Sequence, residues 1–151
     1  MKQGNRTVAK LVKLLLDVLL VIGILFLLAF PILMNSDYNI YKRYKSIALH
    51  MYVILILTDL AIIFVILELR KIYKTIIKGE PFTLDNSRSL FRMGIASFSL
   101  AFVFFIKLFI FKTILTYIML LVLIIAGCFS FTLAELFKEA FRVKEENDLT
   151  I

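Results

Sequence analysis

Four long apolar stretches restrict the folds that this chain of 151 residues can adopt. They cover residues 14–34, 47–69, 89–106 and 114–137. A helix needs about 20 largely apolar residues to cross the hydrocarbon core of a bilayer. The chain is 62% hydrophobic with a mean hydropathy of +0.96, whereas soluble domains are roughly 45–50% apolar. The sequence therefore predicts one all-α membrane domain over residues 1–151, with the lipid bilayer as its solvent.

The basic residues predict the orientation of these helices. Most of the 18 Lys and Arg residues lie before the first stretch, between the second and third, and after the fourth. Such residues gather on the cytoplasmic side of membrane proteins, so these three segments are predicted to be cytoplasmic. The helices then form an antiparallel four-transmembrane-helix bundle with both termini inside. The formal charge of +7 is explained by orientation, and no direct nucleic-acid binding is expected.

Catalytic and metal-binding constellations are not expected from this composition. The chain has one cysteine, Cys128, and one histidine, His50. A disulfide, a Cys-based metal site or a Cys–His catalytic pair needs clusters that these residues cannot supply. We therefore expect a protein that is not an enzyme and has no cofactor.

The stretch GEPFTLDN lies within a cytoplasmic corner predicted over residues 69–88. Residues 69–78 alternate apolar and basic side chains at helical spacing, which is typical of an amphipathic helix at the inner headgroups. Gly79 falls where a left-handed helix end belongs, and Pro81 prevents the helix from resuming. The next helix can be capped by Thr83, Asp85 or Asn86, and the sequence leaves these three open.

Two motifs give the chain a resemblance to a known family. KGEPFTLDNSRSLFRMGI and the terminal FRVKEENDLTI resemble bacterial domain-of-unknown-function family 2975, whose members are small four-span membrane proteins. The matching corner residues are Gly79, Pro81, Phe82, Asn86, Leu90, Arg92 and Gly94. The matching tail residues are Glu145, Glu146, Asn147, Asp148, Leu149, Thr150 and Ile151. Phe91 intervenes between Leu90 and Arg92, which departs from the family pattern and leaves the register of the arginine open.

The resemblance carries implications for location and partners but implies no activity. It places the chain in a bacterial cytoplasmic membrane as a multi-pass protein. Family members are often encoded beside a small helix-turn-helix regulator, which implies a cytoplasmic partner of that kind. The tail, residues 138–151, is acidic and ends in apolar residues. It is expected either to fold back on the basic corner or dock a partner, or else to be a frayed end.

Asp59 lies near the middle of the second stretch. A carboxylate at that depth costs about 2.5–3.5 kcal/mol on insertion scales, so it should face protein and be paired or protonated. The structural interpretation is a hydrogen-bonded carboxyl with a partner such as Ser99 or Ser130. The functional one is a proton or cation pathway. Ala126, Ser130 and Ala134 form a small-residue stripe that allows close approach by a helix of this chain or of a second subunit.

These observations favour a non-catalytic signalling or accessory membrane protein whose corner and tail bind a cytoplasmic partner. One alternative is a homo-oligomeric transporter of protons, cations or small molecules that uses Asp59. Another is an immunity or envelope-stress protein of the membrane.

Overall fold

The structure is a computed structural model that describes the backbone of residues 3–36, 45–110 and 112–149. All of these segments are helical apart from the short connections. The helices are α1 (Gln3–Ser36), α3 (Lys45–Lys78), α4 (Leu84–Ile110) and α5 (Ile114–Leu149). All four are long and apolar enough to cross a membrane, so the chain is a multi-pass membrane protein.

Each helix contains one predicted span and extends beyond it at one or both ends. The third predicted span ends at residue 106, before Lys107, and α4 continues beyond it to Ile110. A lysine in the last turn of a helix can interact favourably with the free carbonyl groups there, so Lys107 does not end α4. At its other end α4 begins at Leu84, directly after Thr83, one of the predicted cap residues.

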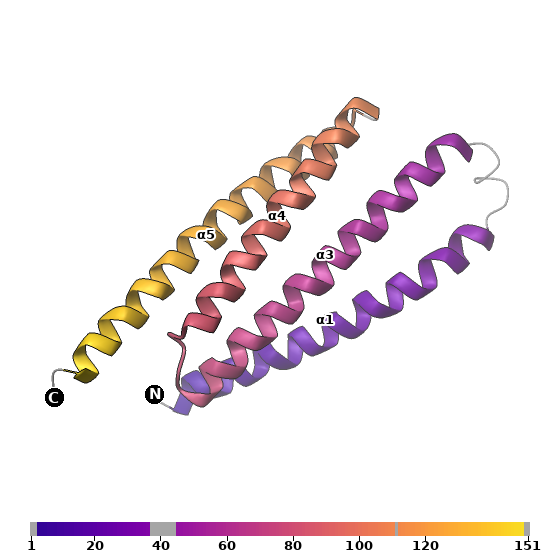
Figure 1. Cartoon of the computed structure of the whole chain (residues 1–151). Helices are drawn as coiled ribbons and strands as arrows, with labels where there is room; N and C mark the ends of the chain where they lie inside the picture. Colours follow the sequence, from indigo (N-terminus) through magenta and orange to yellow (C-terminus); the bar gives the residue numbers. More distant parts are fainter. Residues whose placement is uncertain (1–2, 37–44, 111, 150–151) are drawn as a thin grey trace.

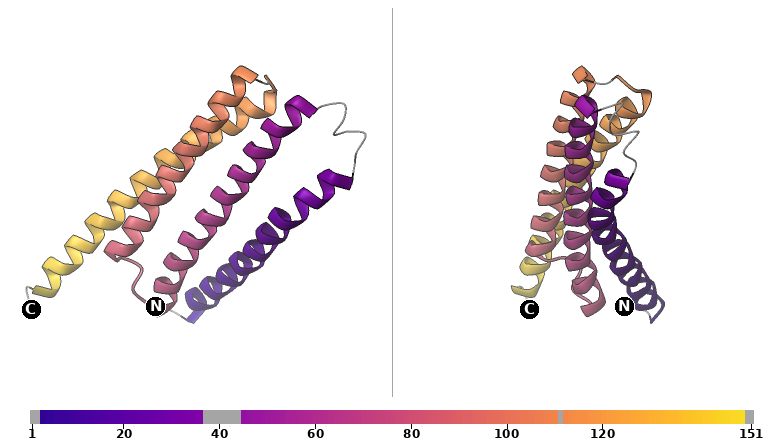
Figure 2. Two further views of the ribbon diagram at one scale, coloured as in Figure 1. Left: turned by 45° about the vertical axis from the view of Figure 1, so that its right-hand side comes forward. Right: turned by 90° about the vertical axis from the view of Figure 1, so that its right-hand side faces the viewer.

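The four helices form an open row rather than a closed bundle (Figure 1). Among the described residues, α1 contacts α3, α3 contacts α4, and α4 contacts α5, whereas the other helix pairs make no backbone approach. The marked N- and C-terminal ends lie toward the same end of the row (Figure 1). In the right-hand view of Figure 2, α1 is inclined to the other three helices. The four predicted apolar helices are therefore present, and they are arranged side by side as a row.

Glycines on α4 and α5 bring these two helices close together. A Cβ atom added to Gly94 would lie 2.5 Å from the ring of Phe131, and one added to Gly127 would lie 2.5 Å from the ring of Phe98. Each phenylalanine thus packs on a glycine of the opposite helix, and the two rings stack with centroids 5.6 Å apart. The hairpin of α4 and α5 is the tightest contact in the row.

The small-residue stripe on α5 contributes to the same hairpin. Ala134 is buried, and its carbonyl oxygen accepts a hydrogen bond of 2.7 Å from the hydroxyl of Ser87 on α4. The neighbour that approaches Ala134 is therefore a helix of the same chain.

Candidate functional site

The corner between α3 and α4 begins with a defined helix stop at Gly79. This glycine has a φ of 90°, in the left-handed region that residues with a Cβ atom rarely adopt. Its N–H donates to the carbonyl of Ile76 at 3.0 Å, and the N–H of Glu80 donates to the carbonyl of Thr75 at 3.1 Å. These two bonds are the pair that defines a Schellman motif. The predicted helix stop at Gly79 is confirmed.

Thr83 is the residue that starts α4. Its Oγ1 accepts a hydrogen bond of 3.2 Å from the N–H of Asn86, and its carbonyl accepts one of 3.2 Å from the N–H of Ser87. This is the pattern of an N-cap, in which the cap hydroxyl accepts from the third helical residue. Of the three candidates that the sequence left open, Thr83 is the cap, and Asp85 and Asn86 lie inside the helix.

Asn86 instead joins α4 to the connection and to α3. Its side chain is only 1% exposed. The Nδ2 amide donates to the hydroxyl of Thr75 on α3 at 2.6 Å and to the carbonyl of Pro81 at 2.6 Å. The Thr75 hydroxyl in turn donates to the carbonyl of Ile72 at 2.7 Å. One buried amide therefore fixes the position of α4 against the end of α3.

An ion pair between the buried Glu68 and the half-exposed Arg92 joins the same two helices further from the corner. Glu68 is 2% exposed. The Arg92 guanidinium donates from Nε to Oε1 at 3.2 Å and from a terminal nitrogen to Oε2 at 2.9 Å, which is a bidentate arrangement. Lys71 donates to Oε1 at 2.8 Å, and Ser89 accepts from Arg92 at 3.1 Å. The sequence did not predict this link between the two helices.

Apolar contacts complete the corner and connect it to α5. Leu90 and Met93 of α4 form a buried cluster with Ile72 of α3 and Ala134 of α5. Phe82, from the connection, meets the ring of Phe137 on α5 edge to face, with centroids 5.3 Å apart. These contacts, with the hydrogen bonds above, hold the end of α3, the start of α4 and a middle part of α5 in one fixed arrangement.

The tail extends α5 as a helix instead of folding back onto the corner. The described tail residues reach Leu149 in one continuous helix, so the fold-back hypothesis is wrong for this part of the chain. The last two residues of the predicted tail motif, Thr150 and Ile151, lie outside the described residues. A continuous helix satisfies the backbone hydrogen bonds of the tail internally, which a fold-back would have had to replace.

A groove of about 710 Å³ lies between this extension and Phe82. Its lining combines apolar and polar side chains: Phe82, Leu136, Glu139, Ala140, Val143, Lys144, Asn147 and Asp148. Val143 is 52% exposed, so an apolar side chain of the groove remains open to solvent or to a partner. The predicted tail residues Asn147 and Asp148 thus share one groove with the predicted corner residue Phe82.

The two sequence motifs also lie within the region that matches a known protein family. The model of a family described as a protein of unknown function, DUF2975, matches residues 16–151. The chain belongs to the DUF2975 family. The match covers the whole corner and the whole tail, so both motifs are part of the family region. No curated protein and no solved structure matches the chain. The DUF2975 description assigns no activity, and function has to be argued from the structure.

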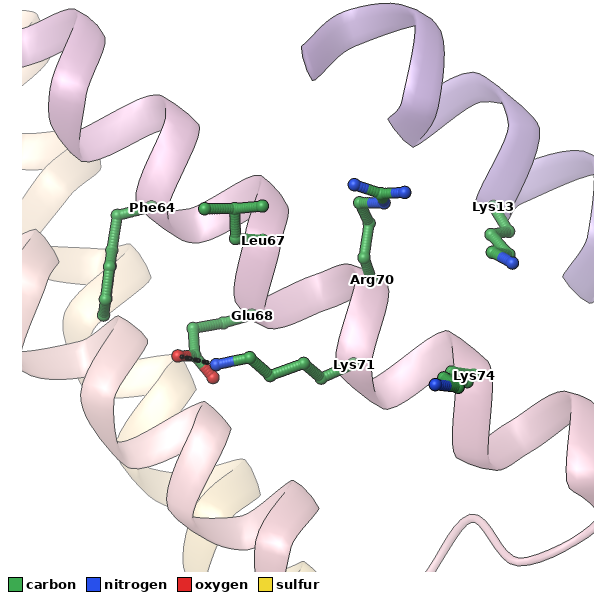
Figure 3. Close-up of a pocket in the computed structure, with 7 residues that line it drawn as sticks. All are labelled: Lys13, Phe64, Leu67, Glu68, Arg70, Lys71 and Lys74. Atoms are coloured by element: carbon green, nitrogen blue, oxygen red, sulfur yellow. Dashed lines mark hydrogen bonds and ion pairs between the residues drawn. The ribbon is translucent and has the colours of Figure 1, made fainter.

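A basic pocket of about 430 Å³ runs along α3 and includes one residue of α1 (Figure 3). Its lining residues are Lys13 from α1 and Phe64, Leu67, Glu68, Arg70, Lys71 and Lys74 from α3. Lys71 is bonded to Glu68, as Figure 3 shows, and Arg70 pairs with Asp17 at 2.6 Å. The excess of positive charge suits the phosphate of an anionic lipid headgroup.

Asp59 lies in the half of α3 that precedes this polar corner. It is 8% exposed, and α1 covers it at Gly23, where an added Cβ atom would lie 3.7 Å from Oδ1. Its Oδ2 atom is buried and has no hydrogen-bond partner among the described residues. The predicted bonding to Ser99 or Ser130 is therefore wrong for this oxygen.

Proposed function

We propose that this DUF2975 protein is a non-catalytic accessory or signalling protein of a bacterial cytoplasmic membrane, whose inner end holds a cytoplasmic partner. In this proposal the helices run antiparallel with both termini inside, and the corner and the extension of α5 face the cytoplasm. The position of the chain ends at one end of the row supports this orientation (Figure 1). The basic pocket at that end supports it as well, since cytoplasmic surfaces are enriched in Lys and Arg.

The groove beside Phe82 is the observation on which the proposal rests. Its apolar side chains are bordered by Glu139, Lys144 and Asp148, which gives a partly apolar floor and a charged rim. Amphipathic helices bind to grooves of this kind by placing apolar anchors at helical spacing. The rigid corner keeps Phe82 in place, so the groove is formed before the partner arrives. A small helix-turn-helix regulator, as the family resemblance implies, can supply such a helix.

Co-purification with the candidate regulator tests this proposal. The protein is reconstituted in nanodiscs, and binding of the purified regulator is measured by size-exclusion chromatography and biolayer interferometry. Val143→Ser removes an apolar side chain from the groove and should weaken binding. Val8→Ser is the matched control, because Val8 is also an exposed valine, at 60%, but lies on α1 outside the groove and the tail. Equal effects of the two substitutions, or no binding at all, would contradict the proposal.

Transport through an oligomer is the second candidate function, and the unpartnered Oδ2 of Asp59 is the observation that favours it. Ionisable residues inside a membrane often mark ion or proton pathways. Ion flux into liposomes that disappears in Asp59→Asn would support transport, whereas unchanged leak in wild type and variant would oppose it.

A further inference from the structure

A cavity of about 330 Å³ beside Asp59 draws its lining from all four helices. Phe26 comes from α1, six residues from Met51 to Ile62 come from α3, Phe104 and Lys107 come from α4, and Leu115, Thr116 and Met119 come from α5. Small-molecule sites commonly have volumes of about 300–1,000 Å³, an apolar lining and a few polar groups. This cavity has that composition. It is separate from the groove beside Phe82, because the two share no lining residue.

The polar groups of the lining are already engaged, with Asp59 as the exception. The hydroxyl of Thr58 donates to the carbonyl of Ile54 at 2.7 Å, and the hydroxyl of Thr116 shares a hydrogen bond of 2.7 Å with Thr113. The Lys107 ammonium lies over the ring of Phe104, 5.3 Å from its centroid. Asp59 is the sole carboxylate of the lining, and its buried Oδ2 has no partner among the described residues.

A buried carboxylate without a partner is unfavourable, and a ligand that supplies both charge and hydrogen-bond donors removes that penalty. An ammonium group does both. The apolar side chains around it, such as Phe26, Leu55 and Met119, suit a hydrocarbon or aromatic body. Lys107 disfavours a second cationic group in the same cavity, so a monocation is preferred over a polyamine.

We propose that this cavity binds a small organic monocation, a primary ammonium group carried on an apolar body, with the ammonium against Asp59. The site is independent of partner binding at the inner end, and each can fail without the other.

The test uses 4-phenylbutylamine as the probe and 4-phenylbutanol as a neutral analogue of similar size. Binding is measured by isothermal titration calorimetry on the full chain in nanodiscs of zwitterionic lipid, with empty nanodiscs subtracted to correct for partition into lipid. The amine should bind the wild-type protein more tightly than the alcohol. Asp59→Asn should weaken amine binding by about tenfold or more, as expected for loss of a charge-assisted hydrogen bond, and should leave alcohol binding unchanged.

Glu135→Gln is the control for the loss of one negative charge, because the Glu135 side chain is exposed and lies outside the cavity. It should not change amine binding. Met119→Trp tests the cavity without altering Asp59, because the larger side chain fills the volume, and it should also weaken the amine. This variant decides the matter if Asp59→Asn does not fold. Amine binding no tighter than alcohol binding, or binding that survives both Asp59→Asn and Met119→Trp, would overturn the proposal.

Discussion

Removal of the Arg92 guanidinium should destabilise the contact between α3 and α4, because it leaves Glu68 buried without its bidentate partner. Breaking a fully buried ion pair costs roughly 3–5 kcal/mol. The cost here should be smaller for two reasons. The Arg92 side chain is 45% exposed, and Lys71 still holds one oxygen of Glu68 at 2.8 Å. We therefore expect Arg92→Met to lower the free energy of unfolding by about 2–3 kcal/mol.

Equilibrium unfolding in mixed micelles of mild detergent and SDS, followed by circular dichroism, measures this difference. Arg88→Met is the matched control, because Arg88 lies one turn earlier on α4, is 70% exposed and pairs at 3.5 Å with Asp85, which is 85% exposed. Exposed pairs contribute about 0–1 kcal/mol, so this control should unfold close to wild type. Adding Glu68→Gln to Arg92→Met should recover part of the loss, since no buried charge then remains unpaired. Equal stabilities of Arg92→Met and Arg88→Met would refute the reasoning.

Two further predictions concern the corner and the hairpin. Asn86→Ala should lower the free energy of unfolding by about 1–3 kcal/mol, because it removes the two hydrogen bonds that the buried amide donates to Thr75 and Pro81. Asn86→Asp should not restore the lost stability, since a carboxylate cannot donate these hydrogen bonds. Protection of the backbone amides of residues 79–87 from hydrogen exchange reports on both variants. Unchanged protection would contradict the role of the Asn86 amide. Gly94→Ala should lower the free energy of unfolding by about 1–3 kcal/mol, because the added methyl group overpacks against Phe131. Phe131→Leu should relieve much of this loss in the double variant. Unfolding in SDS measures both variants, and additive losses would argue against a steric cause.

The sequence predicted those features that depend on neighbouring residues. Helix formation in lipid follows from runs of apolar residues, because a spanning backbone must satisfy its own hydrogen bonds. Gly79 was correctly identified as a helix end, since the amphipathic period stops there and a glycine follows. The choice among Thr83, Asp85 and Asn86 could not be made, because all three are good N-cap residues and their local pattern is the same.

Features that depend on contacts between distant segments could not be predicted. Asn86 looked like a cap, but its amide lies against Thr75, which is 11 positions away, and no period in the sequence reports that contact. The ion pair of Glu68 and Arg92 could not be predicted for the same reason, because the two residues are 24 positions apart. The Arg92 motif provided a signal, since a basic residue among apolar neighbours in a spanning helix needs a partner. The order of the helices in the row could not be predicted either, because hydropathy gives the number of helices but not which faces meet.

The open row has a consequence for how the protein is made. Among the described residues, the backbone of each helix lies close only to the helices that precede and follow it in the chain. A helix that leaves the insertion machinery therefore finds its main packing surface on the one inserted just before it. Chains dominated by such local contacts fold faster than those that must bring distant segments together. Assembly can proceed in the order of synthesis, with the hairpin of α4 and α5 closing last.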